Sequence, residues 1–308
     1  MKGPLFYAKI LLFGEYGIIK DSKGLAIPFN SYKGALKTST SLTGEAEKSN
    51  THLKNFYNYL ANLNTDLVSF NLEALKQDVE AGMYFDSSIP QGYGVGSSGA
   101  LVASIYDQYA TDKVTVLENL TREKLLNLKS VFALMESFFH GKSSGLDPLN
   151  SYLSLPILIN SKENIEAAGI PSQKEGAGAV FLLDSEQAGE TEPMVSIFMN
   201  KMKNEGFRKM LSEEFSLYTD ACIDDFLKGN VKSLFGNVKN LSKVVFANFK
   251  PMIPPAFHKV WEKGLQTNDY YLKLCGSGGG GYILGFTEDY NKTKDILKEY
   301  KLELVYRF

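Results

Sequence analysis

A run of small residues, Gly92-Tyr93-Gly94-Val95-Gly96-Ser97-Ser98-Gly99, constrains the fold of this chain more than any other segment. Apolar spacing after it predicts a helix over residues 100–110. Glycine lets a backbone approach a ligand closely, and a helix N-terminus directs N–H groups and a positive dipole end at the turn before it. We therefore predict that the 92–99 turn binds phosphate; the alternative is an ordinary glycine turn before a helix.

Two common phosphate-binding motifs do not fit the 92–99 turn. A Walker A loop closes with Gly-Lys-Ser or Gly-Lys-Thr, and neither follows here. A dinucleotide-binding turn is followed about 20 residues later, after a second strand, by an acidic residue. Helical, polar sequence stands at that distance instead. Other segments of the chain are therefore needed to indicate which kind of phosphate-containing ligand the turn binds.

The composition is that of an ordinary globular protein. Of 308 residues, 44% are hydrophobic and 22% charged, and 33 Lys plus Arg against 35 Asp plus Glu give a net charge of −2. A generally basic nucleic-acid binder is disfavoured, although a local basic patch is not. Cys222 and Cys275 form neither a disulfide framework nor a zinc spacing, and no apolar run reaches the ~20 residues of a membrane span. We expect a cytoplasmic protein without a membrane partner.

Strand and helix signals predict an α+β fold of two domains. Residues 162–178 are polar and contain glycines and a proline, which is typical of a linker, so we predict domains at 1–165 and 166–308. Thr191 is expected to cap a helix, because Pro193 follows within its first turn. Further strands are expected near residues 5–14, 25–29, 83–85, 179–184, 270–274, 282–286 and 302–307, and further helices at 51–64, 122–139, within 205–266 and at 289–300.

Three other features stand out for their chemistry. Lys9 lies inside an apolar strand, where a lysine usually reaches solvent at an edge. Glu136 borders the apolar stripe of the helix over 122–139, and Asp147 follows a Ser-Ser-Gly turn; their ordinary explanations are a helix-edge salt bridge and an N-cap. The 275–281 loop has five glycines in seven positions, which is more than a hairpin requires and indicates close packing under another backbone.

Four segments together carry a family resemblance. Residues 8–16 (Ala-Lys-Ile-Leu-Leu-Phe-Gly-Glu-Tyr) are similar to P-G-K-x-x-L-x-G-E-H, and residues 90–100 to P-x-x-x-G-L-G-S-S-A-A. Residues 274–281 are similar to K-x-T-G-A-G-G-G-G, and residues 140–147 (His-Gly-Lys-Ser-Ser-Gly-Leu-Asp) to H-G-x-x-S-G-x-D. In this order, they resemble the motifs of the GHMP kinases (galactose, homoserine, mevalonate and phosphomevalonate kinases), and mevalonate kinase most of all.

The sequence departs from the family pattern at three places. Tyr7-Ala8 stands for Pro-Gly, Tyr16 for His, and Ser98-Gly99-Ala100 for S-A-A, the last two as in some phosphomevalonate kinases. These changes bear on the substrate rather than on the fold. Diphosphomevalonate decarboxylase is disfavoured because it lacks the lysine of the first motif. Galactokinase is disfavoured because its G-E-H-x-D-Y signature is missing.

The resemblance implies a two-domain GHMP kinase fold, with an N-terminal domain like ribosomal protein S5 domain 2 and a ferredoxin-like C-terminal domain. It implies phosphoryl transfer from ATP, with Mg²⁺, to the primary hydroxyl of mevalonate. Asp147 would accept the hydroxyl proton, and Lys9 would lie beside it and stabilise negative charge. Ser98 and Glu136 resemble the Mg²⁺ ligands. Phosphate contacts are implied for Gly92, Gly94, Val95, Gly96, Ser97 and Ser98, and substrate contacts for Glu15, Thr191, Gly276 and Ser277.

Three alternatives stay open. The acceptor of the same chemistry can be phosphomevalonate, although the few arginines (Arg122, Arg208 and Arg307) lie outside the motifs and favour an unphosphorylated one. A nucleotide-binding regulator without catalysis is disfavoured, because the motifs keep their lysine and carboxylates. An RNA-binding module is suggested only by the S5-like domain, and we expect no nucleic-acid partner. A homodimer is compatible with the sequence.

Overall fold

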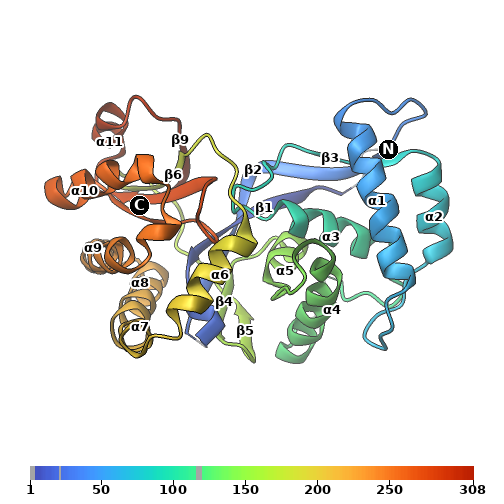
Figure 1. Ribbon diagram of the computed structural model, residues 1–308, viewed down its shortest axis with the longest axis horizontal. Helices are drawn as coiled ribbons and strands as arrows, with labels where there is room; N and C mark the ends of the chain where they lie inside the picture. The colour runs from blue at the N-terminus through green and yellow to red at the C-terminus, as the bar shows by residue number, and fades with distance from the viewer. Residues whose placement is uncertain (1–3, 21, 116–119) are drawn as a thin grey trace. The chain divides into compact units, whose positions relative to one another are not determined.

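The computed structural model describes residues 4–20, 22–115 and 120–308, and both of its compact units contain helices and strands (Figure 1). Unit 1 consists of residues up to 9, 28–90 and 96–155. Unit 2 consists of residues 10–27, 91–95 and 156–308. The predicted α+β class is confirmed.

The chain passes between the units several times, because two strands contribute to both. Strand β1 (Phe6–Phe13) leaves unit 1 after Lys9, and strand β2 (Gly24–Thr38) returns to it at Pro28. The units found from contacts are therefore interleaved along the sequence, whereas the predicted division at 165/166 makes each domain continuous. The division into domains at 1–165 and 166–308 therefore stays a prediction.

Unit 1 has a largely helical core. Its complete elements are strand β3 (Met83–Ser87) and helices α1 (Glu45–Ala61), α2 (Leu72–Glu80), α3 (Ser97–Tyr109), α4 (Arg122–His140) and α5 (Leu146–Leu153). Helix α1 packs on α2 and β3, and its buried residues Leu53, Phe56 and Leu60 lie on one face at helical spacing. Strand β3 pairs antiparallel with residues 34–38 of β2. Helix α3 is buried over most of its length and packs against α4 and α5.

Unit 2 is built around a four-stranded antiparallel sheet in the order β7-β8-β6-β9. Strand β6 is fully buried at its centre, as its unbroken apolar sequence predicts. Helix α9 packs on β7 and β8. The elements of unit 2 are strands β4 (Ile157–Ser161), β5 (Asn164–Ala167), β6 (Ala179–Asp184), β7 (Tyr271–Leu274), β8 (Tyr282–Thr287) and β9 (Leu302–Arg307), helices α6 (Thr191–Lys201), α7 (Glu205–Met210), α8 (Ser216–Lys228), α9 (Val231–Asn248), α10 (His258–Thr267) and α11 (Tyr290–Ile296), and the short helices η1 (Gly17–Lys20), η2 (Leu211–Phe215, a π-helix), η3 (Lys250–Met252) and η4 (Pro255–Phe257).

Three sequence-based assignments need correction. Part of the expected linker at 162–178 is strand β5, which pairs antiparallel with β4. Ile165, in an otherwise polar stretch, is the residue that this strand buries. Thr191 is the first residue of α6 rather than its N-cap, which is Glu190. Asp147 also lies inside a helix, α5, whose N-cap is Gly145 in a left-handed conformation (φ 72°).

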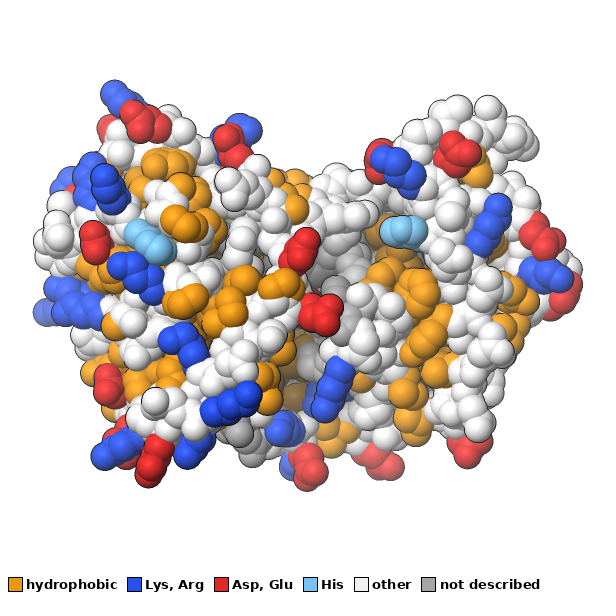
Figure 2. Space-filling model, in the orientation of Figure 1, with side chains coloured by type: hydrophobic (Ala, Val, Ile, Leu, Met, Phe, Trp, Pro, Cys, Tyr) orange, Lys and Arg blue, Asp and Glu red, His pale blue; other side chains and the backbone are white. Residues whose placement is uncertain are grey.

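Charges of both signs are interspersed with apolar side chains on the face of each unit seen in Figure 2. This distribution agrees with the near-balance of acidic and basic residues in the sequence. Among residues 4–20, 22–115 and 120–308, no helix combines the length and the apolar character needed to cross a bilayer.

Candidate functional site

An ion pair between Lys9 and Asp147 is the centre of the site in unit 1. Lys9 Nζ lies 2.9 Å from Asp147 Oδ1, with side-chain exposures of 5% and 36%. Lys9 does not reach solvent at an edge; it extends from β1 towards the first turn of α5. The side chains that the sequence analysis expected to meet are therefore adjacent, with the carboxylate partly open to solvent and the amine buried beneath it.

Two glycines of the 92–99 turn allow this ion pair to form against helix α3. A Cβ on Gly96 would lie 2.9 Å from Lys9 Cγ, and its φ of +81° is a left-handed conformation that favours glycine. A Cβ on Gly99 would lie 2.7 Å from the carbonyl carbon of Asp147 and 2.8 Å from Pro148 N. The absence of side chains at these positions therefore lets Lys9, the N-terminus of α3 and the start of α5 approach closely.

The N-terminus of α3 is suited to an anion. The first N–H groups of an α-helix have no partner within the helix, and the helix dipole adds a positive field there. Gly96 is the N-cap of α3, and Ser97 and Ser98 form its first turn, partly exposed. The lysine amine and the helix N-terminus give this part of unit 1 the positive field and the N–H donors that a phosphate requires.

Glu136 lies next to this surface as a second, more deeply buried carboxylate. It is 3% exposed on α4 and accepts hydrogen bonds from Ser98 Oγ to its Oε1 (3.0 Å) and from Ser143 Oγ to its Oε2. Burial is the main cause that raises the pKa of Glu136 to about 7, and the negative charge of Asp147 adds to it. The two serine hydrogen bonds and Lys9 act in the opposite direction.

The donor set around Glu136 fits a hard divalent cation. A carboxylate and a serine hydroxyl are oxygen ligands of the type that Mg²⁺ prefers, and Mg²⁺ commonly completes its shell with water and substrate phosphates. The raised pKa of Glu136 shows that its negative charge is costly in this buried position. A bound cation would compensate that charge. Among the described residues, no group of three or more His, Cys, Asp or Glu side chains could hold a metal ion. The residues thus suit a cation that arrives with a phosphate ligand.

Ser143 is a site residue that sequence reasoning missed. Its hydroxyl donates to Glu136 and accepts from Gly145 N–H at 3.0 Å. Ser143 stands at an unspecified position of the H-G-x-x-S-G-x-D pattern, so no motif singled it out. Its contact with Glu136 arises because the turn between α4 and α5 folds back over the last turns of α4, which spacing alone does not reveal.

The predicted phosphate residues Gly92, Gly94 and Val95 belong to unit 2, where Gly92 and Gly94 pack on the 275–281 loop. A Cβ on Gly94 would lie 2.7 Å from the carbonyl oxygen of Cys275, and one on Gly281 would lie 2.5 Å from Tyr93 Cα. The close packing that the glycine count predicted is therefore present. It is a contact of backbone on backbone, in which no side chain would fit between residues 92–95 and 275–281.

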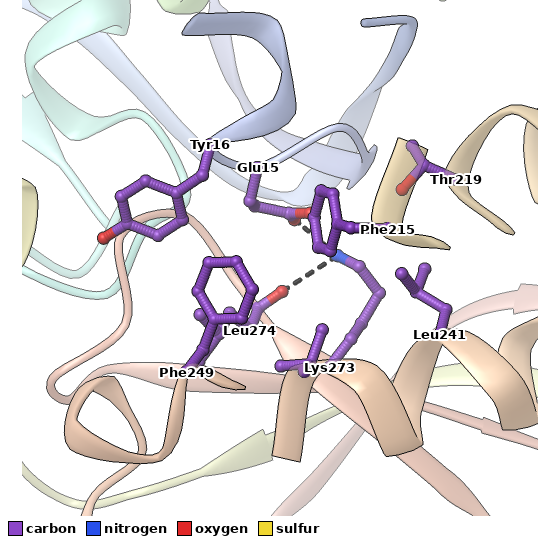
Figure 3. A pocket seen from close by; sticks show the side chains of 9 residues that line it. Glu15, Tyr16, Phe215, Thr219, Leu241, Phe249, Lys273 and Leu274 are labelled. Atoms are coloured by element: carbon purple, nitrogen blue, oxygen red, sulfur yellow. Dashed lines mark hydrogen bonds and ion pairs between the residues drawn. The ribbon is translucent and has the colours of Figure 1, made fainter. Parts of the chain in front are cut away.

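The four residues predicted to contact substrate, Glu15, Thr191, Gly276 and Ser277, also lie in unit 2. Ser277 Oγ lies 3.5 Å from Thr191 Oγ1, and a Cβ on Gly276 would lie 3.1 Å from Gly94 Cα. Glu15 has a different environment, because it is 5% exposed and forms an ion pair with Lys273 (Figure 3). Three of the four residues therefore gather around the two glycine segments, and Glu15 pairs with a cation of the sheet.

Solved structures show what this fold is similar to. L. major mevalonate kinase in complex with R-mevalonate matches with a TM-score of 0.61 at 16% identity, covering 97% of this chain and 93% of that one. Methanococcus jannaschii mevalonate kinase gives 0.60 at 16% identity (99% and 98%). Streptococcus pneumoniae phosphomevalonate kinase in complex with phosphomevalonate and AMPPNP gives 0.62 at 13% identity (98% and 99%).

No protein-family model and no curated protein matches the sequence. At the low identities of the solved structures, the likeness establishes the fold over nearly the whole chain. The predicted two-domain GHMP kinase fold is thus confirmed, and so is the resemblance to mevalonate kinases among its members.

Substitution of Gly99 by alanine tests the close approach of α3 and α5. Alanine is the better helix former, but its Cβ would meet backbone atoms of Asp147 and Pro148, so we expect a loss of roughly 1–3 kcal/mol in the free energy of unfolding. Gly236, which lies within α9 and has open space around it, is the matched control. There the same change should stabilise by roughly 0.5–1 kcal/mol. Urea denaturation measures both, and a stable Gly99→Ala variant would contradict the packing argument.

Substitution of Ser143 by alanine tests its contact with Glu136. The Ser143 hydrogen bond favours the charged carboxylate, so its loss should raise the pKa of Glu136 above its value of about 7. Carbon NMR titration of labelled glutamate measures the shift. Ser144, whose hydroxyl accepts a hydrogen bond from Leu146 N–H, is the control, and Ser144→Ala should leave the Glu136 titration unchanged.

Proposed function

We propose that this protein is an ATP-dependent small-molecule kinase that phosphorylates the hydroxyl group of an alcohol. The observation that carries the proposal is the Lys9–Asp147 ion pair beside the N-terminus of α3. Phosphoryl transfer requires a site that binds phosphates, neutralises charge and orients a nucleophile. The GHMP kinase fold supports the proposal, and one solved structure with this fold contains the ATP analogue AMPPNP.

Each residue has a distinct part in the proposed mechanism. The backbone of the 92–99 turn binds the phosphates of ATP, and Asp147 accepts the proton of the attacking hydroxyl. Lys9 keeps Asp147 ionised and stabilises the charge that develops on the transferred group. Ser98 and Glu136 hold Mg²⁺, which supplies charge neutralisation for the phosphate oxygens when it is bound. Thr191, Gly276 and Ser277 contact substrate from the 275–281 loop and the start of α6.

We further propose that the acceptor is the primary hydroxyl of mevalonate and that the enzyme works in the cytoplasm. The segment 140–147, which looks like the mevalonate kinase motif H-G-x-x-S-G-x-D and contains the proposed base Asp147, supports this acceptor. Cys222 and Cys275 are buried and form no disulfide, which suits a reducing compartment. Phosphomevalonate is the second candidate acceptor, favoured by Tyr16 and Gly99, which some phosphomevalonate kinases share.

An ADP-release assay with ATP and Mg²⁺ tests the proposal. The purified protein is presented with mevalonate, phosphomevalonate, galactose and no acceptor. We expect ADP release to depend on mevalonate, and release only with phosphomevalonate would move the assignment to the second acceptor. Binding of ATP without turnover on any acceptor would instead favour a nucleotide-binding regulator and refute the kinase proposal.

Replacement of Asp147 by asparagine tests its role as the base. Because the amide cannot accept the hydroxyl proton, we expect kcat to fall by roughly a factor of 100 or more while the Kd for ATP changes little. Asp107 forms an ion pair of the same length with Lys113 (2.9 Å) in the same unit, so Asp107→Asn is the matched control and should retain activity. Near-normal turnover by Asp147→Asn would remove this carboxylate from the mechanism.

Replacement of Lys9 by methionine tests the charge beside Asp147. Methionine keeps an apolar stem against Gly96 but removes the ammonium, so we expect kcat to fall roughly 100-fold with a folded protein. The control is Lys113→Met, which breaks the Asp107 pair instead. Kinetics at saturating ATP and circular dichroism separate loss of chemistry from loss of structure, and equal activities of the two variants would contradict the role of Lys9.

A further inference from the structure

The turn after β1 places two consecutive side chains, those of Glu15 and Tyr16, against strand β7 and the 275–281 loop that follows it in unit 2. Gly14 has a φ of 112°, and Tyr16 has a φ of 60°, a left-handed conformation that is strained for a bulky residue. Hydrogen bonds from Gly17 N–H to Glu15 O (2.6 Å) and from Ile18 N–H to Gly14 O (3.1 Å) hold the turn. Such strain persists only where surrounding contacts fix the residue. The contacts of Glu15 and Tyr16 therefore indicate the structural role of this turn.

Glu15 fixes the strand that leads into the loop. Its carboxylate pairs with Lys273 of β7, both side chains are at most 5% exposed, and Lys273 Nζ also donates to the carbonyl oxygen of Leu274 at 2.9 Å (Figure 3). The pair borders a cavity of about 10 Å³ whose other walls are mostly apolar, formed by Tyr16, Phe215, Thr219, Leu241, Val245, Phe249 and Leu274. In such surroundings each charge depends on the other, so the register of Lys273 and Leu274 is tied to the turn.

Tyr16 fixes the loop itself. Its hydroxyl donates to the carbonyl oxygen of Ser277 at 2.6 Å, and its ring stacks on Phe198 of α6 with 4.6 Å between centroids. Burial raises the pKa of the Tyr16 hydroxyl, which keeps it protonated and therefore a donor. The residue thus joins the 275–281 loop to the aromatic side chains beneath it.

The loop needs such an anchor because glycine supplies little conformational restraint. Gly276 and Gly278 have left-handed φ angles of 66° and 78° and carry no side chain that could pack. The C-terminal end of the loop is held separately, by hydrogen bonds from Gly279 N–H to Met252 O (2.7 Å) and from Gly281 N–H to Gln187 O (2.5 Å). Tyr16 contacts the other end, next to the residues that pack on Gly94.

We propose that Tyr16 is a positioning residue for nucleotide binding: its hydroxyl holds the Ser277 carbonyl, and so keeps Cys275 and Gly276 packed on Gly94 in the segment that binds phosphate. Glu15 acts with it through Lys273 and anchors the loop rather than contacting substrate. The inference rests on the proposed kinase function for its nucleotide part. Its structural part, in which the Tyr16 hydroxyl restrains the 275–281 loop at Ser277, does not depend on that function and can be tested without nucleotide.

Replacement of Tyr16 by phenylalanine removes the hydroxyl and keeps the stacked ring. The matched control is Tyr306→Phe, because the Tyr306 hydroxyl also donates to a backbone carbonyl in unit 2, that of Pro171, at 2.7 Å. Hydrogen–deuterium exchange of the ligand-free protein is the first measurement. We expect faster exchange in Tyr16→Phe confined to the peptide over residues 274–281 and its partner segment 92–95, and no such change in Tyr306→Phe.

Nucleotide binding and turnover are the second measurement. The Kd for Mg²⁺-AMPPNP of Tyr16→Phe should rise roughly fivefold, the usual effect of one neutral hydrogen bond, while kcat at saturating ATP stays within about twofold of the wild type. A merely structural hydroxyl would leave Kd unchanged, as we expect for Tyr306→Phe. Exchange over residues 274–281 equal to that of the wild type, or an unchanged Kd in Tyr16→Phe, overturns the inference.

The two proposals fail in different ways. If the wild-type protein binds no Mg²⁺-AMPPNP, the proposed function falls, and the role of Tyr16 in nucleotide binding falls with it. If the wild type binds the nucleotide and Tyr16→Phe binds it equally well, only the inference about Tyr16 is overturned.

Discussion

The site in unit 1 depends on keeping a buried amine and a buried carboxylate close to a second carboxylate that is partly open to solvent. Lys9 is almost fully buried, Glu136 more so, and the pKa of Glu136 rises because its charge is poorly solvated. Lys9 and the hydroxyls of Ser98 and Ser143 offset part of this cost, whereas the charge of Asp147 adds to it. A buried charged cluster of this kind is weak evidence for stability and better evidence for function. That is why we read the cluster as a site for phosphate chemistry.

Two of the departures from the family motifs, Gly99 and Tyr16, make specific contacts in the structure. Gly99, where the motif has alanine, lies against the backbone of Asp147, so a methyl group would push α3 and α5 apart. Tyr16, where the motif has histidine, uses a longer side chain to reach a carbonyl of the 275–281 loop. Both of these departures are matched by a contact elsewhere in the chain, which explains why the fold tolerates them.

Sequence reasoning succeeded where the signal was local. The stripe of α4 and the buried strand β6 follow from periodicity, and the glycine count of 275–281 predicted backbone packing. Reasoning failed where an assignment depends on a contact that periodicity and spacing do not encode, whether the partners are near in sequence or far apart. Strand β5 is short and polar apart from Ile165, and only its pairing with β4 makes it a strand. Ser143 and the Glu15–Lys273 pair required the folded chain, since nothing in their spacing indicates which residues they meet.

The interleaved units also affect how the chain reaches its native state. Residues 10–27 belong to unit 2, but most of that unit follows residue 155. Strand β1 can pair early with β2, but the Gly24–Ala26 edge of β2 pairs with residues 157–159 of β4, which are synthesised more than a hundred residues later. Contacts of such high sequence separation slow folding. The nascent chain therefore exposes this edge of β2 for part of its synthesis, which makes it a candidate client for chaperones that shield exposed strand edges.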